Sequence, residues 1–343
     1  MRKSVVLLFL VFVSILVFFF LNLILGTISI PVKSVWNILC GSGDEQVIWQ
    51  NIILKTRFPQ TLIALVAGAG LSISGLQMQT LFQNPLAGPS ELGISSGASL
   101  GVAFIILLSG SIAGAAMSSL GFFGEVAITI AAVAGAMAVM GIIIAISQRI
   151  RGNVVLLIIG VMIGYIATAI IGVLKFFSNE EDVRAYVIWG LGSFSKVSGN
   201  QVYTFVLIMA CLIPLSFLLI KTLNLMLLGE GYARNLGLNV KRARLYVITC
   251  SCVLTAIITA YCGPIVFLGL AVPHLCRAIF VTSDHRILMP AVTLTGASLA
   301  LFCNLIARMP GFEGALPINS VTALIGAPIV ISVLFGNPRR RGI

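Results

Sequence analysis

The chain has 343 residues, of which 59% are hydrophobic and only 9% charged, whereas soluble domains carry about 25% charged residues. Its net charge of +11 does not indicate a nucleic-acid partner, because no basic stripe with interleaved aromatic residues occurs, and basic residues gather in the cytoplasmic loops of membrane proteins. The composition therefore excludes a soluble globule and predicts an all-α protein that crosses a membrane many times.

Ten apolar segments approach the length of about 20 residues that a membrane-spanning helix needs. The first follows a basic start, but it is longer than the apolar region of a signal peptide and no A-x-A site follows it, so we expect a retained helix. The third is short and rich in glycine and serine, and the eighth is short and interrupted by Pro273. The expected spans are Val5–Leu25, Thr61–Met78, Leu92–Leu108, Val126–Ile146, Val154–Phe176, Val202–Leu223, Leu245–Tyr261, Pro264–Ile279, Ile287–Ala307 and Ile318–Phe335.

The loops between these spans differ in basic charge. With the N-terminus inside, fourteen of the 21 Lys and Arg residues fall on the inner side and seven on the outer side. The positive-inside rule then predicts that both termini lie in the cytoplasm. No soluble domain interrupts the pattern, so residues 1–343 are expected to form one transmembrane domain.

A glycine- and serine-rich stretch follows the turn signals Asn84-Pro85 and Gly88-Pro89. Glycines recur there every four residues, which places them on one helix face that another helix can approach closely. Nearby hydroxyl groups suit a polar wall of a transport pathway, and the two roles are compatible. The residues expected to serve packing or the pathway are Gly93, Ser95, Ser96, Gly97 and Gly101.

All the acidic residues are expected in loops or at helix ends. Intramembrane carboxylates are typical of ion-coupled carriers, so their expected absence weakens the hypothesis of a secondary transporter that works alone. An intramembrane protease is a further alternative, because GISSG (93–97) and His274 imitate a serine–histidine pair. That chemistry requires the nucleophile and the base within hydrogen-bond reach, and nothing in the spacing places them so. No metal site is expected.

A polar segment, residues 227–241, interrupts the apolar pattern on the expected inner side. The sequence GEGYARNLGL predicts a short helix that ends at Gly237. Such a helix suits either docking in a groove of a partner or lying on lipid headgroups. Lys241, Arg242 and Arg244 are expected to anchor the next helix at the membrane surface. The chain has no GxxxxGK[ST] motif, so we expect any ATP and magnesium to be used by a separate subunit and no cofactor to be bound here.

Several blocks in order resemble FecCD-type permeases, the membrane subunits of ABC importers for iron-siderophores, haem and cobalamin. The first block is RFPQTLIALVAGAGLSISGLQMQTLFQNPLAGPSELGISSGASLG, from Arg57 to Gly101. The later blocks are WGLGSFS, LGEGYARNLGLNVKRAR, GPIVFLGLAVPHLCR, DHRILMP and LPINSVTALIGAPIVISVLF. The resemblance extends from Arg57 to the C-terminus.

The resemblance implies the type II ABC importer permease fold, with ten helices per subunit and a pathway between two copies in a homodimer. It also implies two cytoplasmic ATPase subunits and an extracytoplasmic binding protein, in the cytoplasmic (inner) membrane of a bacterium or archaeon. Residues matching the family's coupling helix would dock in the ATPase: Gly229, Glu230, Tyr232, Ala233, Arg234, Leu236 and Gly237.

Two further sites come from the resemblance. Arg57 and Arg308 match outward-facing arginines that receive acidic residues of the binding protein. The cytoplasmic gate of cobalamin permeases falls at Asn153 and Val154, although the hydroxyl side chains of that gate are absent. The implied mechanism is alternating access, in which ATPase closure moves the coupling helices and rocks the subunits. The cargo among iron chelate, haem and cobalamin stays open.

Overall fold

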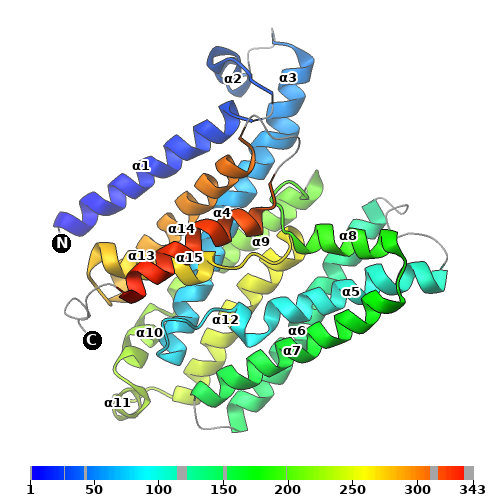
Figure 1. Cartoon of the computed structure of the whole chain (residues 1–343). Helices are drawn as coiled ribbons and strands as arrows, with labels where there is room; N and C mark the ends of the chain where they lie inside the picture. The colour runs from blue at the N-terminus through cyan, green and yellow to red at the C-terminus, as the bar shows by residue number, and fades with distance from the viewer. Residues whose placement is uncertain are drawn as a thin grey trace.

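The computed structural model describes residues 2–26, 28–41, 45–113, 122–149, 153–197, 199–309 and 316–335, and every element among them is helical (Figure 1). The elements are α1 (Arg2–Ile24), α2 (Val32–Leu39), α3 (Val47–Asn51), the π-helix η1 (Ile52–Arg57), α4 (Phe58–Phe82), the 3₁₀ turn η2 (Ser90–Leu92), α5 (Ile94–Ala113), α6 (Phe122–Arg149), α7 (Asn153–Phe177), α8 (Glu180–Gly190), α9 (Asn200–Phe217), α10 (Ile220–Leu227), α11 (Glu230–Asn235), α12 (Val240–Cys262), α13 (Leu268–Phe280), α14 (His285–Ala307) and α15 (Ile318–Phe335).

Helix α4 forms the centre of the bundle, and twenty of its 25 residues are buried. It packs against α9, α12, α13 and α14. Glycines make these approaches possible, since a Cβ on Gly68 would lie 2.4 Å from the carbonyl oxygen of Gly296 in α14. Ser74 adds polar contacts with α12, at 2.5 Å from the Ser251 hydroxyl and 2.8 Å from that of Thr255. Small and hydroxyl residues therefore hold the core together.

Seven helices among the described residues are long and apolar enough to cross a membrane. Three shorter apolar helices, Ile94–Leu108, Leu268–Phe280 and Ile318–Ser332, coincide with the third, eighth and tenth expected spans. The all-helical, multi-span character expected from the sequence is confirmed. The number of ten spans and the N-in, C-in orientation stay predictions.

Several helix ends differ from the sequence-based expectations. The second expected span is part of a continuous helical run from Val47 to Phe82, which includes the π-helical turn η1. The sixth, expected to reach Leu223, ends at Phe217, where Leu218 and Leu219 donate to carbonyls only three residues back. The chain then turns, and α10 packs against α4 and α14. Likewise, residues 264–267 of the eighth expected span are not helical.

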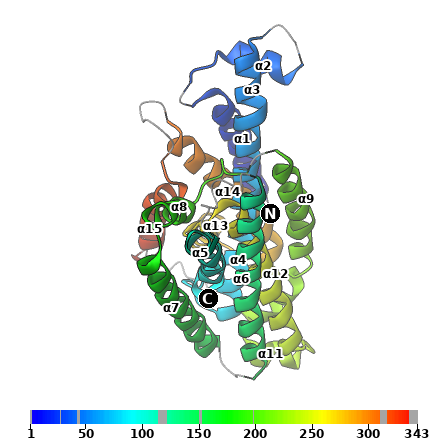
Figure 2. The same cartoon turned by 90° about the vertical axis from the view of Figure 1, so that its right-hand side faces the viewer.

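Different short helices lie at the two ends of the bundle. Helices α2 and α3 lie together at one end, and α10 and α11 lie at the opposite end (Figures 1 and 2). Helix α1 leans away from the bundle and contacts mainly α14, where the hydroxyls of Ser14 and Ser298 are 2.8 Å apart. The sequence pattern did not predict α2 and α8, because both are shorter than a span.

Candidate functional sites

The polar segment expected to couple to a partner forms α11, at the end of the bundle opposite α2 and α3 (Figure 1). Gly229 (φ +91°) and Gly237 (φ +86°) bracket it in conformations that other residues rarely adopt. Tyr232 and Leu236 are 69% and 58% exposed, whereas Ala233 is fully buried. The helix thus turns one side to the bundle and presents a tyrosine and a leucine outward.

An ion pair fixes α11 to the body of the protein. Arg244 of α12 donates to Glu230 at 2.5 Å and to the carbonyl of Ser147, in the last turn of α6, at 3.3 Å. Arg244 is buried. The expectation that Arg244 anchors α12 at the membrane surface is therefore wrong, since a carboxylate on the facing α11 draws it inward. Lys241 and Arg242 remain exposed.

Loss of this ion pair is expected to loosen α11 while the bundle stays folded. Because Glu230 is about one-third exposed, we expect Arg244→Gln to cost roughly 1 kcal/mol. Chymotrypsin should then cleave at Tyr232 or Leu236 about fivefold faster in the purified protein. Arg234→Gln is the matched control, because Arg234 is exposed on α11 and its loss leaves the pair intact. Equal cleavage of the two variants would contradict the anchoring role.

A partly buried hydrogen-bond network joins α10 to the central helices α4 and α14. Asn224 of α10 accepts from the backbone N–H of His285 at 2.9 Å, and its amide donates to Asp284 at 2.7 Å. The His285 ring contacts Asn224 through Nδ1 at 2.8 Å and Thr80 of α4 through Nε2 at 2.9 Å. His285 is fully buried. A displacement of α10 and α11 would therefore be transmitted to α4 and α14 through these contacts.

The glycine face of α5 lies against α6 and α7. A Cβ on Gly101 would lie 2.1 Å from the carbonyl oxygen of Ala131, and one on Gly97 2.7 Å from that of Gly135. Gly93, with φ +76°, abuts Gly160 of α7. These glycines permit close helix contact.

The hydroxyl residues expected beside them occupy two environments. Ser95 is buried, and Ser96 is half-buried and faces Gly164 of α7. Their role in a pathway stays a prediction. At the expected gate, α7 begins at Asn153, whose side chain lies outside the described residues, and Val154 is 68% exposed.

The two arginines expected to face a binding protein lie near each other. Arg57 is 1% exposed, and its guanidinium donates to the carbonyls of Leu23 and Ile24, each at 2.8 Å, and to that of Ile28. It thus satisfies carbonyls at the C-terminal end of α1. The docking role of Arg57 stays a prediction, and in this conformation its side chain is covered.

Arg308 caps the end of α14 beside Arg57. Its Nη1 atom is buried without a hydrogen-bond partner. Burial, together with the charge of Arg57, lowers the pKa of Arg308 to about 10. An acidic group arriving there would gain an unpaired donor, which suits the expected docking role.

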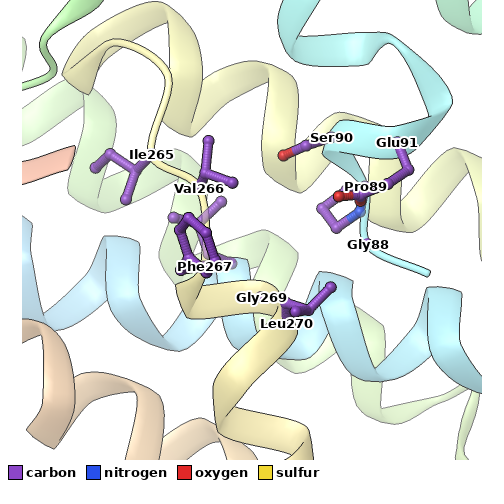
Figure 3. A pocket seen from close by; sticks show the side chains of 10 residues that line it. Gly88, Pro89, Ser90, Glu91, Ile265, Val266, Phe267, Gly269 and Leu270 are labelled. Atoms are coloured by element: carbon purple, nitrogen blue, oxygen red, sulfur yellow. The ribbon is translucent and has the colours of Figure 1, made fainter. Parts of the chain in front are cut away.

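The expectation that the acidic residues lie in loops or at helix ends holds for Glu91, which stands in the loop between α4 and α5. Glu91 lies in η2, and the loop that carries it folds back into the bundle beside Leu71 of α4 and Phe267 (Figure 3). The sequence could not show this, because a re-entrant loop and a surface loop have the same turn residues. Asp44 and Glu313 lie outside the described residues.

A model of the FecCD transport family matches residues 14–336 of the chain. The chain belongs to this family. The Yersinia pestis protein named hemin transport system permease protein HmuU is 33% identical to the FecCD chain over 320 residues, which are 92% of this chain and 91% of that protein. The vitamin B12 import system permease protein BtuC of Salmonella paratyphi A is 35% identical over 299 residues, 86% and 85% of the two chains.

A solved structure agrees with these relatives. It is described as an inward-facing metal-chelate type ABC transporter, and it matches the FecCD chain with a TM-score of 0.81 and 26% identity over 97% of this chain and 100% of that one. The family and the ABC importer permease fold expected from the ordered sequence blocks are confirmed. The individual site residues stay predictions.

Sequence reasoning missed three functional candidates in this FecCD chain. Asn224 and His285 had no signal, because nothing in the sequence pairs a residue inside α10 with one at the start of α14. The DHRILMP block contained His285, but only the structure brings it to Thr80. The turn motifs before Glu91 predict a loop, but they do not show that this loop folds back beside α4.

Proposed function

We propose that the chain is the membrane-spanning subunit of an ATP-driven importer in the bacterial inner membrane, which moves a ferric chelate, haem or cobalamin into the cytoplasm. Two copies would form the pathway, two ATPase subunits would supply the energy, and an extracytoplasmic binding protein would deliver the cargo. The names of the relatives and their high coverage support this reading. The relatives are bacterial, and the archaeal alternative has no support from them.

The observation that carries the proposal is the placement of α11. Its exposed Tyr232 and Leu236 stand one helical turn apart and face away from the bundle. Glu230 and Arg244 hold the helix in a fixed orientation. The partly buried contacts of Asn224 with His285 connect the adjoining α10 to α14, and the contact of His285 with Thr80 extends this connection to α4. An exposed apolar pair on a rigidly held helix suits the groove of a partner subunit.

Permease function predicts that Tyr232 and Leu236 hold the ATPase. The cognate ATPase, co-expressed with this chain, should co-purify in detergent, and the double variant Tyr232→Ala/Leu236→Ala should reduce its recovery at least tenfold. Loss of two buried anchors in an interface commonly costs 2 kcal/mol or more, which corresponds to about thirtyfold in affinity.

The matched control is Tyr203→Ala/Leu207→Ala on α9. These residues have the same types, the same spacing and similar exposure, at 77% and 68%. The control variant should retain the ATPase. If neither the native chain nor the control retained the ATPase, the importer proposal would be wrong. If the Tyr232/Leu236 variant retained the ATPase as well as the native chain does, the docking site would lie elsewhere.

A further inference from the structure

A small cavity of about 90 Å³ lies where two interruptions of the helical bundle meet. The first interruption, residues 83–93, joins α4 to α5, and the second, residues 263–267, joins α12 to α13. Figure 3 shows Ser90 and Glu91 of the first facing Val266 and Phe267 of the second across this cavity. We call it the Glu91 pocket.

The pocket lies beside the middle of the central helix α4. Leu71, near the middle of α4, forms part of its wall. Gly269 at the start of α13 also lines it, and its backbone touches α4 at Gly75. The Glu91 pocket is therefore about halfway along the central helix and distant from the ends of the bundle.

The carboxylate in this pocket is only partly satisfied. The backbone N–H groups of Glu91 and Gly88 lie close enough to favour its charged form. Its Oε2 atom, however, is buried and has no hydrogen-bond partner, and no Lys or Arg forms an ion pair with it in the described part of the chain. A Cβ on Gly88 would lie 2.5 Å from Oε2, so glycine leaves room for the carboxylate to turn into this place.

The opposite wall is held in a strained conformation. Phe267 has φ +62° and ψ −36°, although it is neither glycine nor the C-terminal cap of a helix. Asn319 of α15 accepts from the backbone N–H of Val266 at 3.2 Å, and Gly326 provides the space for the Phe267 side chain. Strained backbone that neighbouring helices maintain is typical of ligand sites.

We propose that the Glu91 pocket binds a positively charged group, such as a primary ammonium, and disfavours carboxylates. A carboxylate that is poorly compensated in a low-dielectric interior attracts a cation strongly and repels an anion by a similar amount. The apolar side chains of Leu71, Val266 and Phe267 suit a short alkyl stem. The volume admits a few heavy atoms, so the pocket takes a substituent of a ligand and not a whole chelate. That the substituent belongs to the imported cargo rests on the proposed function.

The charge preference is testable without knowledge of the cargo. Ser90→Cys is introduced into the full chain after the exposed Cys40 and Cys211 are replaced by serine. The purified protein is labelled with aminoethyl methanethiosulfonate, which is cationic, and with sulfonatoethyl methanethiosulfonate, which is anionic. We expect the ratio of the two labelling rates, normalised to a free thiol, to be about tenfold higher with Glu91 than with the isosteric Glu91→Gln.

Ser195→Cys provides the control, because Ser195 is exposed and lies in the separate loop between α8 and α9. Its labelling ratio should not respond to Glu91→Gln. If Glu91→Gln did not fold, butylammonium would still be expected to protect Ser90→Cys from a neutral methanethiosulfonate, and butyrate to give no protection. Three results would each overturn the proposal. They are equal labelling ratios with and without the Glu91→Gln substitution, equal protection by the two ions, and no labelling of Ser90→Cys. ATPase recovery through Tyr232 and Leu236 tests the importer function separately.

Discussion

Alanine in place of Gly75 is expected to destabilise the bundle strongly, although it adds a single methyl group. The added Cβ would lie 1.7 Å from the carbonyl oxygen of Gly269 and 2.7 Å from its Cα. Backbone atoms cannot rotate away as a side chain can, so α13 would have to move away from α4. Overpacking of this kind costs roughly 1–3 kcal/mol or more. We expect Gly75→Ala to lower the melting temperature in detergent by several degrees and to reduce the fraction of the protein that is monodisperse.

Gly141→Ala in α6 is the matched control for this substitution. A Cβ on Gly141 would meet no atom within 4 Å. Alanine there should leave the melting temperature unchanged or raise it slightly, because glycine is the poorer helix former by about 1 kcal/mol. Equal stability of the Gly75 and Gly141 variants would show that α4 and α13 do not meet as closely as the structure places them.

The contrast between these glycines shows what the sequence predicts about the fold. Length and hydropathy located the long helices well, because a spanning helix needs a long apolar run and little else. Gly75 and Gly141, however, both stand in helices that are long and apolar enough to span a membrane. Gly75 is indispensable only because Gly269, almost 200 residues away in the sequence, packs against it. Packing partners are a tertiary property that a single sequence does not encode locally.

The candidate sites show the same division. The short helix α11 was predictable, since a polar segment between spans has few places to lie and its flanking glycines mark its ends. The ion pair that holds α11 was not predictable, because Glu230 and Arg244 belong to different helices and pair across a turn of the chain. The surroundings of Glu91 were not predictable for a related reason. Turn residues predict where the helix stops, but they do not predict whether the loop turns outward or folds back into the bundle.

Arg57→Met is expected to destabilise the protein far more than Arg308→Met. Arg57 is buried and bonds to three backbone carbonyls at and beyond the end of α1, so its loss leaves one buried and two partly buried acceptors without this donor. Each hydrogen bond to a charged group contributes about 1.5–3 kcal/mol, and we expect a loss of roughly 3 kcal/mol or more. Thermal melting of the two purified variants measures the difference.

Arg308→Met separates the structural role from docking. The Nη2 atoms of Arg57 and Arg308 lie 3.0 and 3.3 Å from the place that a Cβ on Gly26 would occupy, so the two guanidinium groups are close enough to repel each other. Removal of Arg308 should relieve this repulsion and leave the melting temperature unchanged or slightly higher, while affinity for an acidic surface of the binding protein falls about tenfold or more. The opposite result would be an Arg57→Met variant that melts like the native protein but has lost affinity for the binding protein. Arg57 would then have to leave its buried place to dock, and the binding protein would break its contacts with α1.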